Sequence, residues 1–251
     1  MKKLFALLLA LTVLVAFAGC NAEPAPSTEP STEPTLPEGV MTYAEYAAAA
    51  LDSQVTVHTY VQAVESWYNG CVQIYAQSKD GAYYIYNLAC TEEDAAKLVP
   101  GTKIEVSGYK SEWSGEVEIT DATYKILDGS YTVTEAFDVT SLMGTDALAT
   151  HMNKLVAIKG LTVAASKDAN GNEVPFLYKW DGSGSQGDDI YFNVTLGDAT
   201  YTFTVNAYMI GNEATYKAVE ALKVGDKIDV EGFLYWYNGA QPHITAVSAA
   251  K

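Results

Sequence analysis

The chain carries an internal duplication made of glycines and alternating apolar residues. Seven positions recur in the same order 124 residues later: Leu98, Gly101, Lys103, Ile104, Val106, Gly108 and Gly115 return as Leu222, Gly225, Lys227, Ile228, Val230, Gly232 and Gly239. A repeat of this length is too long for the unit of a solenoid and fits two copies of one small domain. The duplication therefore predicts two tandem domains of the same fold.

Each copy shows the element order of a small barrel. In the first copy, β-branched and alternating apolar residues predict strands, with one helix before the fourth strand: strands 55–63, 71–77, 82–87, 103–109 and 116–126, helix 91–98. The second copy repeats the pattern with longer inserts: strands 155–164, 174–180, 190–196, 200–206, 227–235 and 243–247, helix 213–222. This is the order of an OB-fold, a Greek-key barrel. We expect a mainly β fold of two tandem five-stranded OB-like barrels, each with a short helix between strands 3 and 4.

The N-terminus has the pattern of an export signal. Lys2 and Lys3 precede an apolar run at residues 4–17, which is too short to cross a bilayer as a helix. The sequence Phe17-Ala18-Gly19-Cys20 that follows resembles the lipobox of bacterial lipoproteins. The resemblance implies that residues 1–19 are a lipoprotein signal peptide and that a diacylglyceryl group on Cys20 anchors the chain to the outer leaflet of the bacterial cell membrane. The alternative is an ordinary secretory signal with a chance cysteine.

The rest of the chain divides by composition. Residues 21–40 hold five of the eight prolines together with Ser, Thr and Glu, so we expect an extended, solvated segment. The expected parts are a Pro/Ser/Thr/Glu-rich tether (20–40), a first OB-like domain with an N-terminal helix (41–128), a connector (129–153) and a second OB-like domain (154–251). The connector contains a strand-like segment at residues 131–137 and a short helix that ends near Met152.

The negative net charge of the chain distinguishes it from most nucleic-acid-binding proteins. It has 31 acidic and 15 basic residues, every basic residue is lysine, and the formal net charge is -16. Phosphate recognition favours the arginine fork, and affinity for nucleic acid depends on a positive surface. We therefore do not expect nucleic acid as a partner, unless Lys79, Lys103 and Lys110 line one continuous groove.

Cys71 and Cys90 are candidates for a disulfide. If Asp80 and Gly81 form the two-residue loop of a hairpin, the two cysteines lie opposite each other. An oxidising location favours a bridge, whereas the wide spacing of a hydrogen-bonded pair disfavours it. A disulfide and two free buried thiols both remain open.

The repeated segments carry a family resemblance. Residues 98–108 followed by 113–122 resemble the last two strands of OB-fold domains from bacterial surface lipoproteins, and the second copy matches through Gly239 before it slips by one residue. The resemblance implies a binding module outside the cell. It implies no particular activity, because OB-folds carry many functions.

Aromatic residues recur at three expected hairpin tips. The tips are Trp67-Tyr68-Asn69-Gly70, Trp113-Ser114-Gly115 and Trp236-Tyr237-Asn238-Gly239. In an OB barrel such loops flank the usual ligand face, where flat rings stack on sugars or bases. Turn chemistry alone also explains Asn-Gly, with the tryptophan packing the hairpin. Our candidate binding residues are Trp67, Tyr68, Trp113, Trp236 and Tyr237, with Tyr84 on the third strand, beside Tyr83 and Tyr86, extending the platform.

Catalytic and metal motifs are missing from the sequence. His58, His151 and His243 have no metal-ligand spacing, and no nucleophile elbow, P-loop or dinucleotide fingerprint occurs. The oxygen-rich stretch at residues 168–173 departs from the calcium-loop pattern and favours a plain turn. We expect no enzyme, no cofactor and no metal, although an Asp/Glu pair assembled in space stays possible.

These observations favour a non-catalytic, lipid-anchored cell-surface protein that binds a glycan or another protein through its aromatic tips. If only one barrel binds, the first is the stronger candidate. The alternatives are an OB-fold accessory for extracellular single-stranded nucleic acid and a purely structural scaffold for partner proteins.

Overall fold

The computed structural model describes residues 36–250. The predicted signal peptide, Cys20 and nearly all of the tether lie outside the described residues. Within residues 36–250, no helix is long and apolar enough to cross a membrane. The α-helices in this range are short: α1 (Tyr43–Ala48), α2 (Glu92–Ala95) and α3 (Glu213–Glu220).

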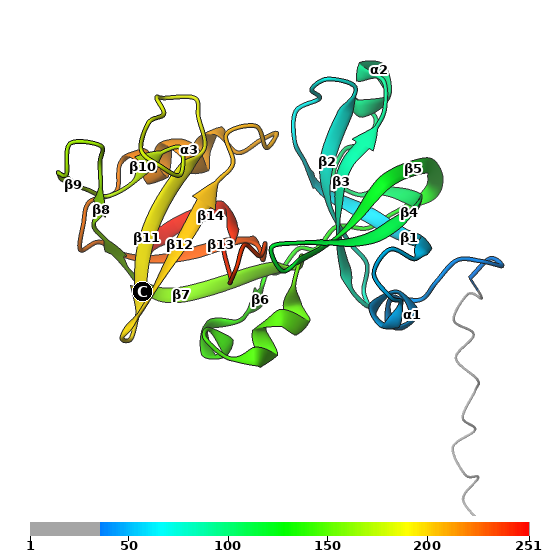
Figure 1. Cartoon of the computed structure of the whole chain (residues 1–251), viewed down its shortest axis with the longest axis horizontal. Helices are drawn as coiled ribbons and strands as arrows, with labels where there is room; N and C mark the ends of the chain where they lie inside the picture. The colour runs from blue at the N-terminus through cyan, green and yellow to red at the C-terminus, as the bar shows by residue number, and fades with distance from the viewer. Residues whose placement is uncertain (1–35, 251) are drawn as a thin grey trace, which may run out of the picture. The chain divides into compact units, whose positions relative to one another are not determined.

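The first domain is a closed five-stranded barrel (Figure 1). Its strands are β1 (Gln54–Val64), β2 (Cys71–Gln77), β3 (Ala82–Ala89), β4 (Thr102–Trp113) and β5 (Glu116–Ser130). They follow the order β1-β2-β3-β5-β4, and β3 runs parallel to β5. Alternate residues of β1, such as Val55 and Val57, are fully buried in the core, as period-two patterning predicts. Before the barrel, Thr42 and Glu45 form the capping box that starts α1.

The second domain repeats this topology. Its barrel strands are β7 (Leu155–Ala164), β11 (Ile190–Leu196), β12 (Ala199–Val205), β13 (Lys227–Phe233) and β14 (His243–Ala249). The pairing of β11 with β7 closes the ring, and β12 runs parallel to β14 as β3 does to β5. Phe192 and Phe203 pack edge to face in its core. The prediction of two tandem OB-like barrels is confirmed.

The repeated glycines have the same structural role in both barrels. Gly101 and Gly225 adopt nearly equal positive φ angles, +95° and +96°. Each donates its N–H to the first strand of its own barrel, Gly101 to Val61 O and Gly225 to Val163 O. At Gly108 and Gly232 an added Cβ would collide with the backbone of the paired strand. The duplication therefore preserves the closing hairpin of a barrel.

The connector and the inserts differ from the predicted strands. The predicted strand at 131–137 is reduced to β6 (Phe137–Asp138), which pairs with β7, and it is followed by the 3₁₀ turns η1 (Thr140–Leu142) and η2 (Asp146–His151). The predicted strand at 174–180 is split into β9 (Glu173–Val174), which pairs with β8 (Ser166–Lys167), and β10 (Leu177–Tyr178). Pro175 separates these pieces because proline donates no ladder hydrogen bond.

The predicted register of the β2–β3 hairpin is wrong. The loop contains four residues, since Gln77 pairs with Ala82 and the Ser78 hydroxyl accepts the N–H groups of Asp80 and Gly81. Cys71 consequently lies opposite Ala89 and not opposite Cys90. Both thiols are free in this structure, and burial together with the nearby Cys71 raises the pKa of Cys90.

Candidate ligand-binding cleft

Two of the three aromatic tips contact each other across the two barrels. The tip of the β4–β5 hairpin meets the loop between β13 and β14, where Asn238 N–H donates to Ser114 O at 2.7 Å and Trp236 N–H donates to Glu116 Oε2 at 2.8 Å. Gly115 leaves room for the indole of Trp236, because a Cβ there would overlap that ring. Trp236 is therefore a packing residue of the junction between the barrels.

A second junction forms near the end of β1. Ser66 N–H donates to Tyr208 O at 2.8 Å, and Ile210 N–H donates to Val64 O at 3.0 Å. Nearby, the rings of Tyr75 and Phe233 stack with centroids 4.5 Å apart. Backbone bonds and buried rings thus fix the two barrels relative to each other.

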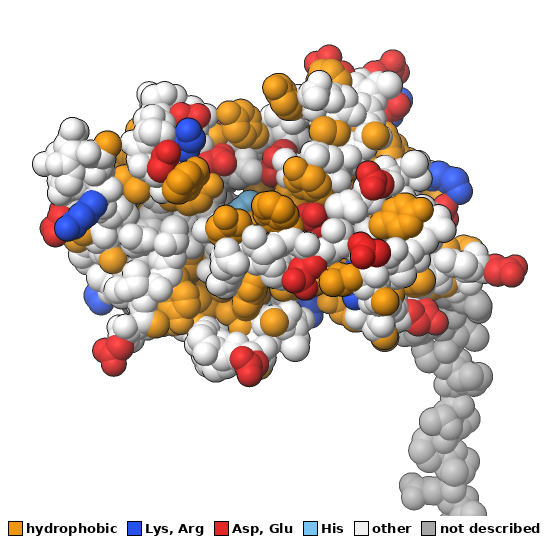
Figure 2. All heavy atoms as spheres, viewed as in Figure 1, with side chains coloured by type: hydrophobic (Ala, Val, Ile, Leu, Met, Phe, Trp, Pro, Cys, Tyr) orange, Lys and Arg blue, Asp and Glu red, His pale blue; other side chains and the backbone are white. Residues whose placement is uncertain are grey.

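A cleft of about 780 Å³ lies between these junctions and takes side chains from both barrels. Figure 2 shows a hollow at this place with apolar side chains around it and histidine atoms at its base. Seven aromatic residues line the cleft: Tyr84, Trp113, Trp180, Tyr191, Tyr208, Tyr235 and Tyr237. Four of them are well exposed: Trp113 (62%), Trp180 (70%), Tyr208 (55%) and Tyr237 (49%). The rim therefore offers open ring surfaces to a ligand.

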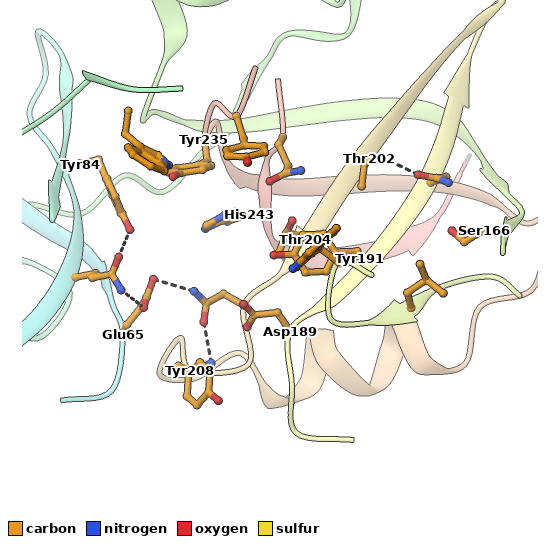
Figure 3. Close-up of a pocket in the computed structure, with 18 of the residues that line it drawn as sticks. Glu65, Tyr84, Ser166, Asp189, Tyr191, Thr202, Thr204, Tyr208, Tyr235 and His243 are labelled. Atoms are coloured by element: carbon orange, nitrogen blue, oxygen red, sulfur yellow. Dashed lines mark hydrogen bonds between the residues drawn. The ribbon is translucent and has the colours of Figure 1, made fainter. Parts of the chain in front are cut away.

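The base of the cleft is a hydrogen-bonded network that spans both barrels. Glu65 follows β1, and its Oε1 accepts from Asn206 Nδ2 while its Oε2 accepts from Gln73 Nε2, each at 2.8 Å. The Tyr84 hydroxyl donates to Gln73 Oε1, and Asn206 Oδ1 accepts the N–H of Tyr208. Figure 3 shows Glu65 and Tyr84 approaching from one side and Asp189 from the other. The network holds the Glu65 carboxylate in one position.

The cleft contains two carboxyl groups, the buried one of Glu65 and the partly buried one of Asp189. Burial and the charge of Asp189 raise the pKa of Glu65 to about 7. Burial also raises the pKa of Asp189, whose Oδ1 accepts the N–H of Ala207 at 2.8 Å. His243, which shares a 2.9 Å hydrogen bond with the Tyr75 hydroxyl through Nδ1, has its pKa lowered to about 4 by burial and is neutral. The base of the cleft is therefore rich in acceptors and acidic.

The structure brings some of the predicted binding residues together and separates others. Trp113, Tyr84 and Tyr237 line the cleft. Trp67 and Tyr68 are outside its lining: the indole of Trp67 donates to Cys90 O at 2.9 Å, and Tyr68 is 80% exposed.

The predicted tyrosine platform on β3 is not formed. Tyr83 and Tyr84 are 2% and 3% exposed, and only Tyr86 is open to solvent. The two rings are buried on opposite faces of the strand: Tyr83 packs in the core of the first barrel against Tyr43 and Tyr46, and Tyr84 is covered by the second barrel. Tyr84 packs its ring against Tyr75 and Tyr235 at the junction.

Most of the polar base and several rings of the rim carry no signal in the local sequence. Glu65, His243, Tyr191, Tyr208 and Tyr235 sit on ordinary alternating strands or just beyond them, and no local pattern distinguishes them. Asp189 and Trp180 had a signal, because they border the polar loop that is present only in the second copy.

Other candidate features have structural roles. Lys110 is buried, and its Nζ donates to the carbonyl oxygens of Tyr46, Ala47 and Ala49 at 2.8–3.1 Å, so it caps α1 and does not join a lysine groove with Lys79 and Lys103. In the 168–173 stretch, Asp168 Oδ1 accepts two backbone N–H groups of a turn. Within residues 36–250 no group of three or more His, Cys, Asp or Glu could hold a metal ion.

No protein-family model matches the chain, and no curated protein sequence does. Solved structures match it at low identity. A murine DNA binding protein bound with ds DNA matches at 11% identity and a TM-score of 0.34, over 78% of this chain and 98% of the other. A HINa domain in complex with 20bp dsDNA matches at 11% identity and a TM-score of 0.36, over 81% of this chain and 98% of the other. A replication protein A heterotrimer bound to ssDNA matches at 7% identity and a TM-score of 0.27, over 89% of this chain and 72% of the other.

These DNA-bound matches contradict our expectation that nucleic acid is not a partner, and we withdraw that exclusion. TM-scores this low carry no argument about what the present chain binds. Its ligand has to be argued from its own cleft.

Proposed function

We propose that this protein is a non-catalytic binding protein of the bacterial cell surface, and that its ligand is a ring-shaped polar molecule, such as a saccharide, held in the cleft between the barrels. The observation that supports this most is the combination, in one cleft, of exposed rings at the rim and fixed hydrogen-bonding groups at the base. Aromatic faces pack against the apolar faces of sugar rings, while placed polar groups select hydroxyls.

The arrangement of the base supports binding without catalysis. Both oxygens of Glu65 already accept hydrogen bonds from side-chain amides, and the Nδ1 of His243 is engaged by Tyr75. Among the residues that line the cleft, no serine, threonine or cysteine is hydrogen-bonded to a histidine as an activated nucleophile would be. The polar groups are arranged to hold a ligand.

Single-stranded nucleic acid is the second candidate. The same exposed rings, Trp113, Trp180, Tyr208 and Tyr237, suit it because every base has a π-face that stacks on aromatic side chains. We place it second because phosphate groups would approach the carboxyl groups of Glu65 and Asp189, and Lys167 is the one basic side chain in the lining.

A binding screen tests both candidates. The protein is applied to a glycan array and titrated with fluorescent single-stranded oligonucleotides at low and high salt. Trp113→Ala and Trp180→Ala are compared with Tyr68→Ala, a matched control because Tyr68 is exposed and lies outside the cleft lining. We expect glycan binding that weakens about tenfold in the two tryptophan variants and is unchanged in the control.

Three results would overturn the proposal. Oligonucleotide binding that falls with salt and requires both tryptophans, without glycan binding, would establish the second candidate. Equal binding by all variants would place the ligand elsewhere. A complete absence of binding in both assays would leave a structural scaffold as the function.

A further inference from the structure

The two carboxyl groups of the cleft lack a cationic partner. Glu65 comes from the first barrel and Asp189 from the second; both line the cleft, and they accept hydrogen bonds from the adjacent residues Asn206 and Ala207, each at 2.8 Å. Five ion pairs occur among the described residues, and neither carboxyl group takes part in one. Two acidic groups in one cleft, one of them buried, are unfavourable as a pair of carboxylates unless a proton or a bound cation balances them.

The residues that line the cleft supply little positive charge to these two carboxyl groups. The chain contains no arginine, and Lys167, the single lysine of the lining, has an exposed side chain at the rim. Glu65 receives only neutral amide donors, and Asp189 receives the N–H of Ala207 on Oδ1. No hydrogen bond from residues 36–250 reaches Asp189 Oδ2. That oxygen is available to a donor that arrives with a ligand.

A second polar group in the cleft lining is also without a partner. Thr204 on β12 is only 2% exposed, and its Oγ1 makes no hydrogen bond with the described residues. Buried hydroxyls in proteins nearly always have a partner, so the Thr204 hydroxyl is a polar group next to the cleft that the described residues leave unsatisfied. Figure 3 shows Thr204 in the second barrel near His243.

The aromatic rim of the cleft also favours a positively charged ligand. The faces of Trp113 and Trp180 carry negative electrostatic potential and attract an ammonium group as well as stacking on a ring. The acidic base and the aromatic rim of the cleft therefore both favour a positively charged ligand.

We propose that the cleft selects ligands in which a polar ring carries a primary amine, as in amino sugars, with the ammonium group seated between Glu65 and Asp189. This inference rests on the proposed function of the cleft. The ring stacks on the rim tryptophans, and the ammonium donates to Asp189 Oδ2 and to the carboxylate of Glu65. Hydrogen bonds to charged groups of this kind contribute more than neutral ones, so the amine should set the preference.

A matched pair of probes tests the inference by calorimetry. Glucosamine trimer and N-acetylglucosamine trimer share the ring skeleton, and only the first carries free amines. We expect the wild type to bind the amine form at least about tenfold more tightly. The variants Glu65→Gln and Asp189→Asn keep the shape of each side chain and should each reduce the ratio to about threefold or less.

Glu173→Gln is the control, because Glu173 is exposed and lies outside the cleft lining, and it removes the same charge. It should retain the full ratio. Equal affinity of the wild type for both trimers, or binding of neutral glycans alone, would overturn the amine preference while leaving the cleft as a glycan site. An unchanged ratio in both carboxyl variants would also overturn it. Loss of all glycan binding in every assay would instead refute the proposed function.

Discussion

Glu116 is buried at the junction between the barrels, and its ionisation should weaken the fold. The residue is fully buried at the start of β5, its Oε2 accepts the N–H of Trp236, and its Oε1 has no partner. Burial is the largest cause that raises its pKa, to about 8, with a further contribution from Glu118. The folded protein therefore holds a proton here at neutral pH.

The sign and size of the effect follow from this pKa. An unfolded chain releases the proton near the ordinary value of 4.5, so the folded state binds more protons between that value and about 8 and loses stability as pH rises through this window. At about 1.4 kcal/mol for each pH unit, the full loss is roughly 5 kcal/mol, reduced by any relaxation around the carboxylate. Glu65, with a pKa of about 7, acts in the same direction.

Glu116→Gln removes the ionisable group and keeps an acceptor for Trp236. Its amide can also donate to the buried Oδ1 of Asn153, which has no partner. In urea unfolding followed by fluorescence, we expect the variant to match the wild type near pH 5 and to exceed it by several kcal/mol near pH 9. Glu173→Gln should show no such difference. A Glu116→Gln effect of equal size at both pH values would refute the argument, as would wild-type stability that does not fall between pH 5 and 9.

Three further predictions concern other parts of the chain. Lys110→Met should lower the free energy of unfolding by about 1–3 kcal/mol, because three carbonyl groups at the end of α1 lose their donor; unchanged urea unfolding would contradict this. Gly232→Ala should lower the melting temperature in calorimetry, with a cost of about 1–3 kcal/mol, because its Cβ would collide with the backbone at His243; a wild-type melting temperature would mean that the closing hairpin tolerates the change. Cys20→Ala should move the protein from the detergent phase to the aqueous phase in Triton X-114 partitioning, since the predicted lipid is lost; identical partitioning would exclude the anchor.

The barrels were predictable from sequence because local patterns determine them. Alternating residues of β1 and β11 set which side chains enter the core, and Gly101 and Gly225 mark equivalent turns. The register of β2 and β3 was not predictable, because Ser78 closes the loop with its side chain and a bulge follows along the ladder.

The cleft was only partly predictable because it depends on contacts between the barrels. Trp113 and Tyr237 were found through their turn motifs. Glu65 and Asp189 come together only when the segment after β1 pairs with residues 206–210. No sequence periodicity reports such a long-range contact. Trp236 lies at a hairpin tip as Trp113 does, but its ring packs on Gly115 and is not part of the cleft lining.

The two separate junctions have a consequence for how a ligand would enter. One joins Val64 and Ser66 to Ile210 and Tyr208, and the other joins Ser114 to Asn238. Two junctions restrict the barrels to rotation about the line that joins them, and the buried stack of Tyr75 on Phe233 resists that rotation. We therefore expect the walls of the cleft to be in place before a ligand arrives, so that binding needs no closure step and association is limited by diffusion and orientation. Either barrel alone would present half of the cleft and leave its share of the Tyr75–Phe233 stack open to water.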